Sequence, residues 1–163
     1  RESRTGCPAF LSKFIVIVEA SEKPENRLPQ AIKERYTNIP QSWLEFISTV
    51  KSAINDDGTT WFLCKNDFEI RSEEPFRWNE WEIISLESAE KDILWEAEIK
   101  QFWNRHLPII LSVKNGYAYY AISMENGSIG YGAEPEFEEC DIVARTFEEF
   151  MKKVINHEIY VLD

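Results

Sequence analysis

Residues 108–132 have the sequence PIILSVKNGYAYYAISMENGSIGYG, and this stretch decides the fold. It holds three short β-prone runs, 108–113, 117–123 and 128–132, separated by Asn115-Gly116 and Asn126-Gly127. Asn-Gly is the preferred pair for tight turns, because both residues tolerate a positive φ. The stretch therefore predicts a three-stranded antiparallel meander.

Helices are predicted on both sides of this meander. Leu28-Pro29 opens a short helix that reaches about Tyr36, and Ile39-Pro40 opens a second helix. The second helix is expected to reach Ile54, because apolar residues recur on one helical face: Trp43, Ile47, Val50 and Ile54. After the meander, a short strand at 142–144 leads to Thr146-x-x-Glu149, a capping box that opens a closing helix.

Other segments give weaker patterns. Residues 9–20 fit either a strand or a helix, and Pro8 favours the helix. Residues 61–64 and 81–86 are each predicted as strands, with a long loop over 65–80 between them. Ser88 is expected to cap a helix that extends to about His106, with these apolar and aromatic residues: Ile93, Leu94, Ala97, Phe102 and Trp103.

Together these elements predict a single α+β domain over residues 1–163. The antiparallel sheet contains the meander of 108–132, and the N-terminal helices and the C-terminal helix are expected to pack on one face. A chain of 163 residues fits one domain and can bury a core without a disulfide or a metal.

The charge is strongly negative and unevenly distributed. Basic and acidic residues cancel over residues 1–60, whereas residues 61–163 hold ten basic and 21 acidic residues and so all of the net −11. Such a field repels nucleic acid and anionic lipid, and attracts a basic protein. It also serves solubility, which is the plainer interpretation.

Catalytic and metal-binding patterns are not found in the sequence. Cys7, Cys64 and Cys140 are far apart, and His106 and His157 show no ligand spacing. No glycine-rich phosphate loop or membrane-spanning run is present either. We therefore predict a cytoplasmic protein with reduced thiols, no cofactor, no metal and no catalytic residue.

Two segments are candidates for partner binding. Aromatic residues alternate with charges between residues 73 and 82, a composition that suits either an interface or a cover for the sheet edge. An acidic run follows the meander and suits either a solvated loop or a rim that engages Lys and Arg. The candidate residues are Glu74, Phe76, Trp78, Glu80, Glu134, Glu136, Glu138, Glu139 and Asp141.

Three stretches resemble the SUKH superfamily of α+β domains. The first is residues 39–47, IPQSWLEFI, which is similar to the family's Leu-Pro helix. The second joins Leu107-Pro108-Ile109-Ile110 to the segment 115–120, and the third is residues 142–150, IVARTFEEF. The resemblance covers about residues 28–155. Residues 55–60 and Tyr117 depart from the pattern, which leaves the branch of the family open.

The resemblance implies a non-enzymatic protein-binding domain. Many members are bacterial immunity proteins that neutralise a toxin, often a nuclease or a deaminase, so a basic toxin domain is the expected partner. The alternative is a regulatory scaffold that binds a host protein, as in the fungal cell-wall-assembly regulators. A third interpretation is an enzyme that uses Cys64 or His106, but the sequence indicates no reaction for it.

Overall fold

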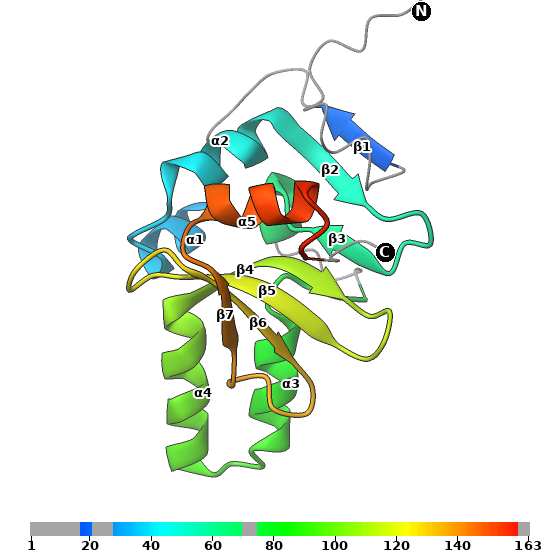
Figure 1. Cartoon of the computed structure of the whole chain (residues 1–163). Coiled ribbons are helices and arrows are strands. Elements are labelled where there is room, and N and C mark those ends of the chain that lie inside the picture. The colour runs from blue at the N-terminus through cyan, green and yellow to red at the C-terminus, as the bar shows by residue number, and fades with distance from the viewer. Residues whose placement is uncertain (1–16, 21–27, 70–74, 160–163) are drawn as a thin grey trace, which may run out of the picture.

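Seven strands form one antiparallel sheet in which each strand pairs with its neighbour in the chain. The computed structural model describes residues 17–20, 28–69 and 75–159 (Figure 1). The strands are β1 Ile17–Ala20, β2 Val50–Ile54, β3 Thr60–Phe62, β4 His106–Ser112, β5 Ala118–Ser123, β6 Ile129–Ala133 and β7 Asp141–Ala144. The helices are α1 Gln30–Arg35, α2 Gln41–Thr49, the 3₁₀ turn η2 Lys65–Phe68, α3 Glu80–Ser88, α4 Ile93–Arg105 and α5 Phe147–Ile155.

The predicted meander is confirmed as β4, β5 and β6. Gly116 and Gly127 both have positive φ, at 88° and 75°, as the two Asn-Gly turns require. The turn before β6 is closed by a 2.8 Å bond from the backbone nitrogen of Gly127 to the carbonyl oxygen of Ser123. The turns thus fix the register that pairs Tyr119 with Gly132 and Tyr120 with Tyr131.

Helices cover both faces of the sheet (Figure 1). Successive strand residues point to opposite faces. The ring of Tyr119 lies 4.9 Å from that of Trp103 on α4, whereas the ring of Tyr120 lies 5.1 Å from that of Phe150 on α5. On the α5 face, Phe46 of α2 contacts Phe147 of α5 with ring centroids 5.6 Å apart. The expected packing of an N-terminal helix and the C-terminal helix on one face is therefore confirmed for α2 and α5, and α3 and α4 add a layer on the other.

The closing helix begins as predicted. The hydroxyl oxygen of Thr146 accepts a 3.0 Å bond from the backbone nitrogen of Glu149. The Glu149 carboxylate accepts a 2.8 Å bond from the backbone nitrogen of Arg145, one residue before the expected partner. Four apolar side chains of the helix are buried, at Phe147, Phe150, Met151 and Val154.

The strand predicted at 81–86 is wrong, because these residues belong to α3. The buried stripe of α3 consists of Trp81 and Ser85 and continues at its C-cap, Ala89; these residues lie four apart, and two of them are small. Glu82 is also buried, because Arg35 of α1 binds both its carboxylate oxygens at 2.8 and 3.0 Å. Because several buried positions of α3 hold a small or a charged residue, the spacing of its apolar residues does not show a helical period.

Two helix boundaries also differ from the prediction. Helix α2 ends at Thr49, whose hydroxyl bonds back to the carbonyls of Glu45 and Phe46, and residues 50–54 continue as strand β2. Helix α4 begins at Ile93, because Asp92 is its N-cap and accepts a 3.1 Å bond from the nitrogen of Trp95. Ser88, the predicted cap, is instead the last residue of α3.

The helix favoured over residues 9–20 is wrong at residues 17–20, which form β1. This strand pairs with β2 and matches Ile17 with Ile54 and Val18 with Ala53. Residues 9–16 lie outside the described residues. The β-branched composition was thus the better guide to this segment.

Gly132 is required by the packing of Tyr119. A Cβ atom at position 132 would overlap the ring carbon Cζ and the hydroxyl oxygen of Tyr119, its cross-strand partner. We expect Gly132→Ala to lower the free energy of unfolding by about 1–3 kcal/mol in urea titrations. In a Tyr119→Leu background the same substitution is expected to cost much less. An equal cost in both backgrounds would contradict this account.

Arg35 of α1 is partly buried and bonds to two other helices, the first through its ion pair with Glu82 of α3. Its Nε also donates a 2.9 Å bond to the side-chain oxygen of Asn104 on α4. Glu82→Ala should therefore destabilise the fold by roughly 3 kcal/mol, since it leaves Arg35 partly buried without its counter-charge. The double variant Arg35→Met with Glu82→Leu should be less destabilised than Glu82→Ala, as measured by urea unfolding. A double variant that is less stable than Glu82→Ala would show that the charges themselves stabilise the fold.

Candidate binding groove

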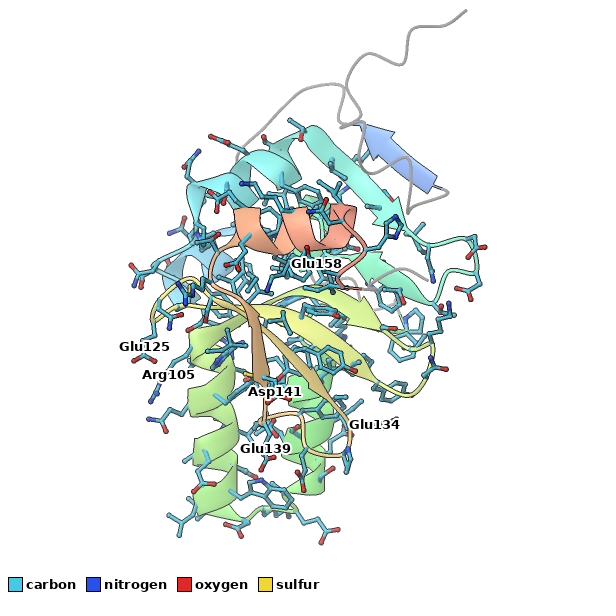
Figure 2. All side chains as sticks on the ribbon, in the orientation of Figure 1. Arg105, Glu125, Glu134, Glu139, Asp141 and Glu158 are labelled. Carbon is cyan, nitrogen blue, oxygen red and sulfur yellow. The ribbon has the colours of Figure 1, made fainter. Side chains whose placement is uncertain are left out.

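An open groove of about 720 Å³ lies between the C-terminal end of α4 and the segment that joins β6 to β7. We call it the acidic groove, because five carboxylates line it: Glu134, Glu136, Glu138, Glu139 and Asp141. Phe102, His106 and Cys140 complete the wall on the α4 side. Figure 2 shows Glu134, Glu139 and Asp141 along this segment, below the sheet and beside the helices. The structure thus brings the whole predicted acidic run to one depression.

Two of the five carboxylates hold the fold together. Oε1 of Glu134 accepts a 3.0 Å bond from the backbone nitrogen of Tyr117 at the start of β5. Oε1 of Glu138 accepts a 2.8 Å bond from the indole nitrogen of Trp103 on α4. These two residues therefore position the β6–β7 segment, a role that the sequence did not indicate.

The other three carboxylates are available to a partner. Glu136, Glu139 and Asp141 are exposed, and they form no ion pair or side-chain hydrogen bond with the residues that the structure describes. Three like charges at one groove raise the local negative potential and favour an incoming cation. This part of the acidic run is the strongest candidate for binding.

The aromatic segment before α3 belongs mainly to the core. Trp78 is buried, and Phe76 is partly buried against the rings of Trp61, Trp81 and Tyr117. Of the two interpretations left open for this segment, the burial of Trp78 and Phe76 favours a cover for the sheet. Glu80 accepts a 3.2 Å bond from the backbone nitrogen of Arg77 at the start of α3. Glu74 lies outside the described residues.

Cys140 and His106 meet in the groove, a contact that the sequence could not predict. The thiol sulfur lies 4.0 Å from Nε2 of His106, and Nδ1 lies 2.8 Å from the carbonyl oxygen of Phe102. That carbonyl can only accept, so Nδ1 carries the hydrogen and Nε2 of the neutral ring presents its lone pair to the thiol.

This pair is not arranged as an activated nucleophile. Burial lowers the pKa of His106. Burial, together with the charge of Asp141, raises the pKa of Cys140. Both shifts favour a neutral thiol beside a neutral imidazole over the thiolate–imidazolium pair of a cysteine nucleophile. Cys64 is fully buried, and burial raises its pKa to about 12.

Three exposed apolar residues were missed as surface candidates. Ile93, Leu94 and Trp95 open α4 and are exposed. The sequence analysis named the first two among the apolar residues of this helix and did not single them out as surface residues. Consecutive residues of a helix point about 100° apart, so three in a row cannot share one face. That geometric conflict is the signal by which the sequence could have revealed them.

Two further kinds of site are absent from the described ranges. No group of three His, Cys, Asp or Glu side chains within 17–20, 28–69 and 75–159 could hold a metal ion. Within the same ranges, no helix is long and apolar enough to cross a bilayer.

The protonation state of Cys140 can be measured directly. We expect the thiol to react slowly with iodoacetamide at pH 7, and its rate to rise only above the pH at which an exposed thiol titrates. His106→Gln should leave the rate at pH 7 within about twofold, because the imidazole holds no thiolate. Peptide mapping by mass spectrometry separates Cys140 from the other two cysteines. A large loss of reactivity in His106→Gln would reveal an ion pair.

Comparisons with known proteins add no relative. No protein family, curated protein sequence or solved structure matches this chain. The acidic groove is therefore assigned from its geometry and charge alone.

Proposed function

We propose that this chain is a non-catalytic protein-binding domain whose acidic groove takes Lys and Arg side chains of a partner protein. The observation that carries the proposal is the set of three exposed carboxylates, Glu136, Glu139 and Asp141, that have no cationic partner among the described residues. Complementary charge of this kind accelerates association and selects partners.

The electrostatics favour a protein over a nucleic acid as the partner. All of the net −11 lies in residues 61–163, which include the groove. This field repels phosphate backbones and attracts basic protein surfaces. The neutral thiol–imidazole contact of Cys140 and His106 supports a binding role for the groove and not covalent catalysis.

In biological terms, we propose an immunity protein that neutralises a basic toxin domain of the nuclease or deaminase type. The support is the resemblance of residues 39–47, 107–120 and 142–150 to the SUKH superfamily. These segments form much of α2, β4, β5, β7 and α5, which are the framework of the fold. The residues that line the groove lie outside these segments, so a shared framework leaves the binding face free to differ.

Charge reversal tests the proposal. A partner is first isolated from the source organism with the wild-type chain as bait, identified by mass spectrometry and purified. The triple variant Glu136→Lys, Glu139→Lys, Asp141→Lys should slow association with it by about tenfold or more at low salt, because steering is lost. Glu134 and Glu138 are left intact, since both hold the fold.

The matched control reverses three exposed carboxylates away from the groove, at Glu45, Asp56 and Glu158. It changes the net charge by the same amount and should slow association much less. Equal effects of the two triple variants would show that net charge, and not the groove, guides binding. The partner is then expressed in cells with and without this chain. Toxicity that co-expression of this chain relieves would support the immunity role over the regulatory scaffold.

A further inference from the structure

The first turn of α4, directly after its connection to α3, presents large apolar side chains to solvent. Ile93 is 80% exposed, Leu94 79% and Trp95 45%. We call residues 90–95 the hairpin tip. Single exposed apolar residues are ordinary on a protein surface, whereas three large ones around one helix end are a candidate interaction site.

These side chains are exposed because the first turns of α4 extend beyond the sheet. The buried residues of α4, Ile99 and Trp103, lie in its second half, where the helix crosses β5. Figure 1 shows the N-terminal half of α4 beside α3 alone, with no strand against it. The overhang therefore has no apolar surface of this chain to cover it among the described elements.

The backbone of the tip is strained. Glu90 and Lys91 have φ of 48° and 70°, two consecutive non-glycine residues in the left-handed region. This conformation is uncommon for residues that have a Cβ atom, and strain that persists in a fold often marks a functional segment. The Asp92 cap then starts α4 at once, so that Ile93 is already its first helical residue.

Acidic residues surround the apolar tip. Five carboxylates lie within residues 87–98, at Glu87, Glu90, Asp92, Glu96 and Glu98, against the one cation Lys91. Two copies of such a tip would repel each other, and an anionic bilayer would repel it as well. The charge pattern instead complements an apolar pocket that is bordered by Lys and Arg.

We propose that the hairpin tip is the apolar anchor of the partner interface, and that it enters an apolar pocket bordered by basic side chains on a partner protein. This inference rests on the proposed function. Figure 1 shows the hairpin end and the β6–β7 connection on the same side of the sheet, opposite α5. The bond from Trp103 to Glu138 also ties α4 to the groove, so one partner can contact both.

The two sites differ in what they contribute. Exposed charges act chiefly on the rate of association, whereas a desolvated aromatic or aliphatic anchor acts chiefly on the rate of dissociation. Kinetics with one partner therefore separate the tip from the groove.

The experiment begins by placing the photo-crosslinker benzoylphenylalanine at position 94, or at the exposed control position Lys152 on α5. Each full-length chain is irradiated in an extract of the source organism. The protein that crosslinks at position 94 and not at 152 is purified, and its binding kinetics with unmodified variants are measured by surface plasmon resonance.

Leu94→Ser should speed dissociation at least tenfold and leave association within about twofold. The matched control is Ile142→Ser, which removes another large apolar side chain, 66% exposed, from β7; both of its rates should stay within twofold. Fluorescence gives a further readout: the emission of half-exposed Trp95 should shift to the blue in the complex, and Trp95→Phe should abolish the shift.

The outcomes separate the two proposals. If Leu94→Ser binds as the wild type does while the groove triple variant associates slowly, the anchor is overturned and the proposed function stands. If neither variant changes binding, both are overturned. Crosslinks from position 94 to this chain alone would identify a second copy as the occupant and overturn the proposed partner.

Discussion

The constraint on which the structure depends is the burial of strand β4 on both faces. Residues 107–111 are all buried, so their alternating side chains need an apolar cover above and below the sheet. Helices α2 and α5 supply one cover and helices α3 and α4 the other. The helices of these covers are also bonded to elements outside their own layer. The ion pair of Arg35 and Glu82, for example, holds α1 to α3. Both candidate binding surfaces lie on the layer built from α3, α4 and the β6–β7 segment.

The parts of the fold that were predicted correctly are those that local chemistry determines. The Asn-Gly turns fix the meander through positive φ, and Thr146 fixes the start of α5 through its hydroxyl. Helix α3 was mistaken for a strand, because its burial depends on residues far away in sequence. Trp81 lies between the rings of Tyr117 and Phe137, and Glu82 needs Arg35, 47 residues earlier, to be buried at all.

The candidate site was likewise predictable only where composition determines it. Composition alone identified the acidic run as a possible rim, and the structure gathers it at one groove. Which carboxylates are free was not predictable, because the donors to Glu134 and Glu138 come from Tyr117 and Trp103 in other elements. For the aromatic segment, composition left an interface and a cover for the sheet open, and the burial of Trp78 favours the cover. The hairpin tip was missed because its exposure depends on how far α4 extends past the sheet, which the sequence does not show.

The attachment of the β6–β7 segment has a consequence for the entropy of binding. The segment is fixed at three successive points: the carboxylate of Glu134, the backbone carbonyl of Phe137 and the carboxylate of Glu138, which accept bonds from Tyr117, Tyr119 and Trp103. Glu136 and Glu139 lie beside these points, so their backbone is already ordered before a partner arrives. A partner that binds them orders only side chains, and the free energy that a disordered acidic loop would lose on binding is retained as affinity.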